Sequence, residues 1–179
     1  MNNLMMKGKV VLLVLMSLIT VTACNDDDDD VDLNQMTAQE FVNRATMSNM
    51  FEIQTSQPAD QNASTDDVKD FAQRMINDHA TATVALQTIA SSKNMPITTS
   101  LTEEKQAIQS RLAGETGVAF DKDYVKVQID AHNEAISLFE QAADDLDDVE
   151  LKAYAQATLP VLRQHLQMAQ DLKTMTDQL

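Results

Sequence analysis

Four long stretches of this sequence repeat apolar side chains every three or four residues, and few helix-breaking residues interrupt them. The 179-residue chain contains 3 glycines and 3 prolines, and 4% of its residues are aromatic. Sheet proteins need more turn residues and more strand-forming aromatic side chains than this. The pattern therefore predicts an all-α fold, and the length suits a single domain.

The predicted helices are joined by short turns except at one long connection. The first begins at a capping box formed by Thr37 and Glu40, and Pro58 kinks or ends it. Two more helices should cover residues 65–93 and the stretch from 120 to an acidic turn at 144–148. The last starts near residue 149, with a kink at Pro160, and a short helix over 101–113 lies in the long connection. Two hairpins joined by this crossover predict a ferritin-like four-helix bundle over residues 37–179.

The N-terminal residues 1–23 have the composition of a signal peptide. Lys7 and Lys9 precede an apolar run over residues 10–21, which is too short for a typical membrane-spanning helix. The run ends in small residues before Cys24, and this ending resembles a bacterial lipobox. Because Cys24 is the only cysteine, we expect it to be acylated and to anchor the protein in a membrane. Two alternatives to acylation stay open. The segment could be an uncleaved anchor, or it could be a cleaved secretory peptide followed by an incidental cysteine.

An acidic segment follows the cysteine. Five consecutive aspartates occupy residues 26–30, and we expect residues 24–36 to form a solvated tether. The whole chain has a net charge of −15, and cleavage before Cys24 would remove two basic residues and no acidic ones. Nucleic acid is therefore not expected as a partner. The expected location is the bacterial cell envelope, facing the periplasm or, because acid-rich segments also resemble surface-export signals, exposed on the outer membrane.

Four segments of the sequence together resemble a bacterial envelope family called domain of unknown function 4142. They are FVNRATMSNMFEI (residues 41–53), VKDFAQRMINDH (68–79), FDKDYVKVQIDAH (120–132) and LPVLRQHL (159–166). The resemblance covers residues 37–175 and is weakest over residues 54–64. It implies a secreted or lipidated four-helix bundle of the ferritin-like class, and it assigns no reaction.

The three histidines of the chain occupy similar positions in three of the predicted helices. His79, His132 and His165 each fall on the apolar stripe of their helix, and Glu52 does so on the first helix. At ~1.5 Å per residue, all four lie near the middle of helices about 40 Å long. We therefore expect these side chains to meet at a common depth inside the bundle.

Three imidazoles beside one carboxylate would suit a divalent metal ion. The set predicts a mononuclear site for zinc, copper, manganese or iron, and Met75 and Met168, one turn away from histidines, are candidate additional ligands. The alternative is a structural or interaction lipoprotein in which the histidines are hydrogen-bonded core residues. Both interpretations remain open from the sequence.

Enzymatic functions find little support in the sequence. A ferritin-like redox enzyme would need a glutamate three residues before its histidines, where this chain has Ile76, Ile129 and Leu162. Motifs for nucleophilic hydrolysis and phosphate binding are absent from the sequence, so no catalytic residue is predicted. Acidic residues next to the histidines in sequence are expected to face solvent: Asp78, Asp130 and Glu134.

Overall fold

A computed structural model describes residues 35–98 and 100–179, and the regular structure within them is entirely helical. The helices are α1 (Ala38–Ser56), α2 (Ala59–Asn62), α3 (Asp66–Ser92), α4 (Glu103–Ala113), α5 (Gly117–Asp145) and α6 (Val149–Thr176). The predicted signal peptide, Cys24 and the aspartate run lie outside the described residues. None of the described helices combines the length and hydropathy needed to cross a membrane.

Two of the long helices begin at local capping signals. The Oγ1 atom of Thr37 accepts a hydrogen bond from the backbone N–H of Glu40 at 3.2 Å, so the predicted cap of α1 is confirmed. The side chain of Asp148 caps α6 by accepting hydrogen bonds from two backbone N–H groups of its first turn. At the other end of α1, the helix stops before Pro58, and the short helix α2 occupies the turn that follows.

The boundaries differ from the prediction at two places. α5 begins at Gly117, three residues earlier than predicted, because Gly117 has a φ of 67° and turns the chain directly into the helix. Among the described residues, Met36 is already packed in the core, with an exposed fraction of 4%, whereas the predicted domain starts at residue 37. The helix α6 continues through Pro160.

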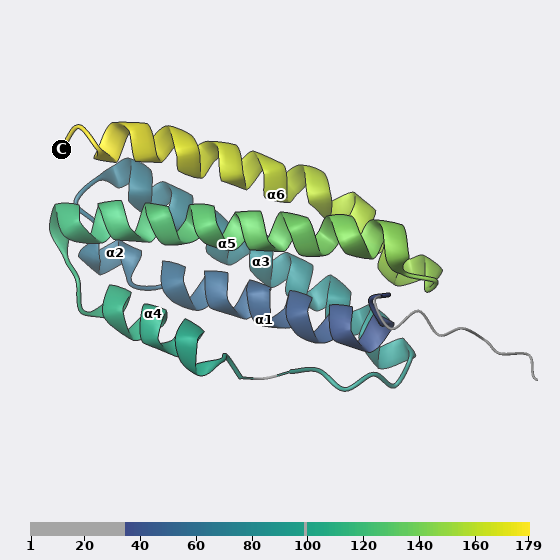
Figure 1. The fold of residues 1–179 in the computed structure, drawn as a ribbon. Helices are drawn as coiled ribbons and strands as arrows, with labels where there is room; N and C mark the ends of the chain where they lie inside the picture. The colour runs from purple at the N-terminus through teal and green to yellow at the C-terminus, as the bar shows by residue number, and fades with distance from the viewer. Residues whose placement is uncertain (1–34, 99) are drawn as a thin grey trace, which may run out of the picture. The chain divides into compact units, whose positions relative to one another are not determined.

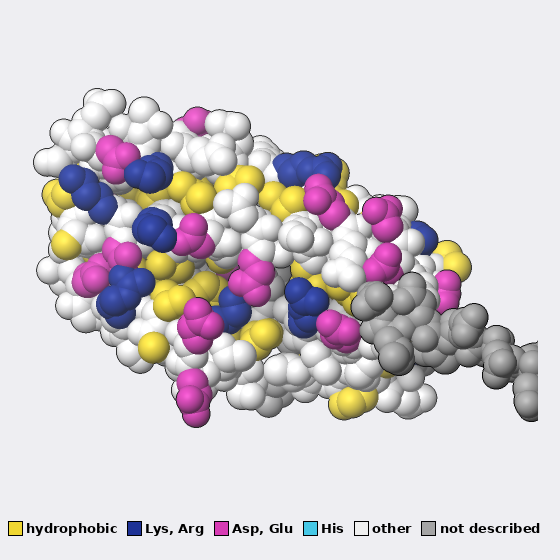
Figure 2. Space-filling view, in the orientation of Figure 1, with side chains coloured by type: hydrophobic (Ala, Val, Ile, Leu, Met, Phe, Trp, Pro, Cys, Tyr) yellow, Lys and Arg dark blue, Asp and Glu magenta, His cyan; other side chains and the backbone are white. Residues whose placement is uncertain are grey.

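Four long helices pack side by side (Figure 1). α1 packs along α3, α5 packs along α6, and the contacts of α1 with α5 and of α3 with α6 join the two pairs. The short helix α4 lies in the long connection between α3 and α5 and contacts both α1 and α5. On the face drawn in Figure 2, acidic and basic side chains surround apolar ones, and no histidine is visible among the described residues.

The buried apolar side chains form two clusters, and a polar layer lies between them. One cluster includes Phe41, Leu86, Phe139 and Leu162, and the other includes Phe71, Met75, Phe120 and Leu172. Along each of α3, α5 and α6 the chain passes from one cluster to the other in a short interval. These intervals are residues 75–86, 131–135 and 162–169, and each contains one histidine.

Candidate metal centre

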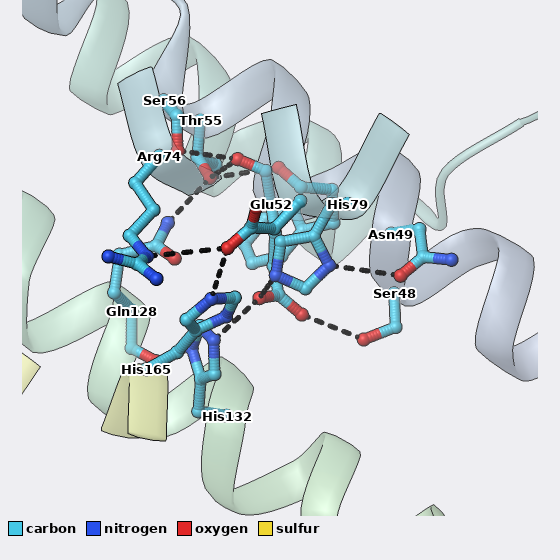
Figure 3. A network of polar contacts seen from close by, with 12 residues as sticks. Ser48, Asn49, Glu52, Thr55, Ser56, Arg74, His79, Gln128, His132 and His165 are labelled. Atoms are coloured by element: carbon cyan, nitrogen blue, oxygen red, sulfur yellow. Dashed lines mark hydrogen bonds and ion pairs between the residues drawn. The ribbon is translucent and has the colours of Figure 1, made fainter. Parts of the chain in front are cut away.

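Four side chains from four helices meet in the polar layer. Glu52 belongs to α1, His79 to α3, His132 to α5 and His165 to α6. Their exposed fractions are 0%, 3%, 0% and 1%. The structure therefore brings together all four residues that the sequence places on the apolar stripes, with their polar groups facing one another (Figure 3).

The nitrogen and oxygen atoms of this cluster are close together. One ring nitrogen from each histidine lies within 4.8 Å of the others, and the ring centroids are 5.4 to 5.6 Å apart. The Oε2 atom of Glu52 is 2.9 Å from Nε2 of His79 and 3.2 Å from Nε2 of His132. Ligands of one metal ion at ~2.0–2.2 Å are separated by similar distances, so the cluster is already compact enough to approach a first coordination shell.

Two of the histidines are oriented by hydrogen bonds from their outer nitrogens. Nδ1 of His132 donates to the main-chain oxygen of Gln128 at 2.8 Å, since that oxygen can only accept. Nδ1 of His79 lies 3.0 Å from Oδ1 of Asn49, an amide oxygen that also accepts. Protons on both Nδ1 atoms leave both Nε2 atoms directed at Glu52, the arrangement common in metal-binding histidines.

His165 is held in the same way by a carboxylate. Its Nε2 atom is 2.9 Å from Oδ2 of Asp78, which leaves Nδ1 as the nitrogen with a free lone pair. Arg74 lies one turn before Asp78 on α3, and its Nε atom is 3.4 Å from the same carboxylate oxygen. A carboxylate behind a histidine fixes the tautomer and raises the basicity of the nitrogen opposite.

Four buried atoms of this cluster have no hydrogen-bond partner. They are Oε2 of Glu52, Nε2 of His79, Nε2 of His132 and Nδ1 of His165. Oε2 of Glu52 is nevertheless in short contact with both Nε2 atoms, at 2.9 and 3.2 Å, and it holds a proton with His79 when that ring is charged. Buried polar atoms are normally satisfied, so four unpartnered donor atoms at one place need an explanation.

Further hydrogen bonds lie next to the cluster, one within α1 and two between α1 and α5. Ser48 donates to Oε1 of Glu52 at 3.0 Å, so only the other carboxylate oxygen is unpartnered. One turn further along α1, the Ser56 hydroxyl is 2.7 Å from the hydroxyl of Tyr124, and the Gln128 amide donates to Thr55 Oγ1 at 3.0 Å. Such side-chain contacts hold the two helices in one register.

The charge state of the cluster follows from its surroundings. Burial alone would raise the pKa of Glu52, but the nearby His132 and His79 outweigh burial and lower this pKa to about 2. Burial also lowers the pKa of His79, and the Glu52 carboxylate more than offsets it, so the pKa of His79 rises above 6.5. Burial lowers the pKa of His165 to about 4, despite Asp78. A metal ion would thus replace a proton held between Glu52 and His79.

One prediction about the neighbouring acids is only partly correct. Asp78 is expected from the sequence to face solvent, but its carboxylate contacts buried His165, and 37% of its side chain is exposed. Successive side chains on a helix point about 100° apart around its axis, so Asp78 points about 100° away from His79. The helix α6 packs on that side of α3, and the Asp78 carboxylate therefore meets His165. Asp130 and Glu134 are exposed, as predicted, and pair with Lys126 and Lys105.

Sequence reasoning also missed the residues that orient the cluster. Asn49 lies three residues before Glu52, and Gln128 lies four residues before His132. A spacing of three places the Asn49 side chain on the same helical face as Glu52, so this signal was available. Gln128 contacts His132 through its main-chain oxygen, which any residue at that position would supply. Of the two methionines proposed as further ligands, Met75 is fully buried in an apolar cluster and Met168 lines a groove beside Asp78.

The family resemblance is confirmed by comparison with known proteins. The sequence profile of DUF4142, a domain of unknown function, matches residues 25–172. The chain belongs to the DUF4142 family. No curated protein matches the sequence.

Solved structures share the fold of this DUF4142 chain at low sequence identity. CopM in its Cu(II)-bound form is 16% identical with a TM-score of 0.67, and the alignment covers 78% of this chain and 97% of CopM. The Cu(I)-bound form gives 18% identity and a TM-score of 0.65, with coverages of 76% and 95%. A DUF305 protein from Streptomyces coelicolor, inferred to be secreted, is 11% identical with a TM-score of 0.69. That alignment covers 79% of this chain and 94% of the DUF305 protein. At these identities the likeness establishes a shared helical fold.

Proposed function

We propose that this protein binds one transition-metal ion through Glu52, His79, His132 and His165. The observation that carries the proposal is a set of four buried nitrogen and oxygen atoms, one from each long helix, that could bind a metal and have no hydrogen-bond partner. Each histidine is also oriented by a hydrogen bond to its other nitrogen. These two features together are those of a metal site with its supporting outer contacts.

The donor set favours a mononuclear centre. Three imidazoles and one carboxylate suit zinc, copper, iron or manganese, whereas di-iron centres use carboxylates from all four helices. Copper is the first ion to test, because CopM shares the fold and was solved in Cu(II)- and Cu(I)-bound forms. Met75 and Met168 would add soft ligands for copper only after a rearrangement of the core and the groove.

The proposed setting is the cell envelope. A signal peptide over residues 1–23, acylation of Cys24 and an acidic tether would attach a ferritin-like four-helix bundle to a membrane. Such a protein would sequester or sense metal ions outside the cytoplasm. The DUF305 structure of an inferred secreted protein is consistent with this location.

The alternative is a structural or interaction lipoprotein whose histidines only stabilise the core. That function predicts a polar layer in which the imidazoles and the carboxylate satisfy one another. The contact of Glu52 with His79 meets part of this expectation, but Nε2 of His132 and Nδ1 of His165 have no hydrogen-bond partner, and this favours metal binding over the alternative.

Elemental analysis of the purified full chain tests the proposal. We expect one equivalent of metal after incubation with Cu²⁺ or Zn²⁺ alone and desalting, and a rise in melting temperature of about 5 °C or more. A His79→Ala/His132→Ala/His165→Ala variant should bind none. The matched control is Glu134→Gln, which neutralises an exposed carboxylate of α5 and should bind as the parent does. A metal-free parent of unchanged stability would overturn the proposal.

A further inference from the structure

An open groove of about 590 Å³ between α3 and α6 reaches the candidate centre at Asp78. Four acidic side chains line it, and Arg74 is its single basic residue. The acids are Asp67, Asp70, Asp78 and Asp171. A cleft lined mainly by one sign of charge concentrates ions of the opposite sign and raises their rate of association.

The inner end of this groove is in contact with the cluster itself. Asp78 is partly exposed, and its Oδ2 atom contacts Nε2 of His165, which is 1% exposed. The ring of His165 in turn lies 5.5 Å from that of His79 and 5.4 Å from that of His132, between centroids. A single imidazole therefore separates a solvent-accessible carboxylate from the remaining donors.

A second approach to the cluster lies on the opposite side, and it is less suitable for a cation. It would pass Ser48, which donates to Glu52. The hollow there measures about 20 Å³ and is lined by two basic side chains, Arg44 and Lys105, against one acid, Glu134. Of these two hollows, the groove between α3 and α6 is the larger and the more acidic.

We propose that metal ions reach the centre through the groove between α3 and α6, and that Asp78 receives the ion and positions His165 as it binds. Arg74 restrains the Asp78 carboxylate, since its guanidinium is 3.4 Å from the oxygen that contacts His165. The inference rests on the proposed metal-binding function and adds an access route and two residues that control it. It predicts that neutralising Asp78 slows metal association and that neutralising Arg74, its ion-pair partner, accelerates it.

Stopped-flow binding of Cu²⁺ to the full chain tests this route. The chain has no tryptophan and two tyrosines, so quenching of tyrosine emission by Cu²⁺ provides a signal. Asp78→Asn keeps an oxygen that can accept from His165 but removes the charge, and we expect it to slow association about tenfold. Arg74→Gln removes the one opposing charge of the groove and should accelerate association about threefold.

Two matched carboxylates calibrate the result. Asp171→Asn, in the groove but not in contact with His165, should slow association about twofold, and Glu134→Gln, on the opposite side, should leave it unchanged. Raising the ionic strength should slow the parent more than Asp78→Asn.

The results separate this inference from the proposed function. If the parent binds Cu²⁺ stoichiometrically but Asp78→Asn and Arg74→Gln associate at the parental rate, the access route is wrong and the metal centre stands. If the parent binds no metal in elemental analysis, the centre and its access route both fail.

Discussion

Glu52 and Asp121 are both completely buried carboxylates, yet the protein holds them in opposite ways. Asp121, on α5, accepts hydrogen bonds from the backbone N–H groups of Ser64 and Thr65 and from the Ser64 hydroxyl, at 3.0, 3.1 and 2.6 Å. It thereby caps the start of α3, whose own Thr65 side chain makes no capping bond. Glu52 has one oxygen bonded to Ser48 and the other unpartnered.

The difference teaches how a structural acid can be told from a candidate ligand. A buried charge is expensive, and Asp121 recovers the cost through three donors on a neighbouring turn. Glu52 recovers only part of it, because its second oxygen faces two imidazole nitrogens that bear lone pairs when neutral. A cation between these atoms would complete the interaction, whereas Asp121 has no need of one.

The strongest test of this contrast is Glu52→Gln. The side-chain amide can donate to an imidazole nitrogen, so we expect the metal-free protein to remain as stable as the parent within about 1 kcal/mol. Loss of the anionic ligand should weaken metal affinity by more than about 100-fold, which exceeds the range for outer contacts. Isothermal titration with Cu²⁺ and with Zn²⁺ measures the affinity, and unchanged binding would remove Glu52 from the centre.

Asp121→Ala should produce the reverse pattern. Two backbone donors at the start of α3 lose their partner, and we expect the free energy of unfolding to fall by about 2 kcal/mol while the metal stoichiometry is retained. Urea denaturation of the metal-free chain measures this loss. Asp130→Ala is the matched control, because it removes an exposed carboxylate of the same helix and should change stability by less than about 0.5 kcal/mol.

An outer contact of the cluster should have an intermediate effect. Asn49→Ala removes the oxygen that accepts from Nδ1 of His79 and so releases the orientation of that ring. We expect metal affinity to drop about tenfold. Asn77→Ala, at an exposed position of α3, should leave affinity unchanged. Equal effects of the two substitutions in titration calorimetry would contradict a specific role for Asn49.

The pH dependence of the metal-free protein should be the smallest effect, because two histidines act in opposite directions on either side of pH 6.5. The raised pKa of His79 stabilises the folded state as the pH falls toward 6.5. The pKa of His165, lowered to about 4, destabilises it as the pH falls from 6.5 to about 4, since the unfolded chain binds the proton first. Stabilisation by Glu52 is present above 4.5 and is lost toward pH 2.

Denaturation of the metal-free chain from pH 8 to pH 3 checks these signs. The parent should show a shallow optimum near pH 6.5 and a steeper loss in acid. A His165→Gln variant should lose the decline between pH 6.5 and 4. Retention of that decline in the variant would show that another group causes it.

Much of the fold could be predicted from local patterns. The start of α6 at Val149 agrees with the prediction, because its capping residue Asp148 and its apolar periodicity act over one or two turns. The start of α3 at Asp66 also agrees with the prediction, although its cap is supplied by Asp121 of α5. The start of α5 differs because Gly117 can either close a loop or open a helix. Only the packing of the neighbouring elements selects between these two outcomes.

The candidate site shows the same division. The inward positions of His79, His132 and His165 follow from helical periodicity, which depends on each helix alone. The contact of Asp78 with His165 depends on which side of α3 the helix α6 occupies, and a periodic pattern does not contain that information.

From the amino-acid sequence alone, one can derive four long helices, their apolar stripes and the polar side chains within those stripes. The tertiary structure decided which atoms meet: it paired Asp121 with the start of α3, placed Asp78 against His165 and left four donor atoms facing one another without partners. The physical reason is the distance along the chain over which each kind of interaction acts. Helix formation is set by neighbours within a few residues, whereas the partners of a buried polar atom are set by how separate helices rotate and pack.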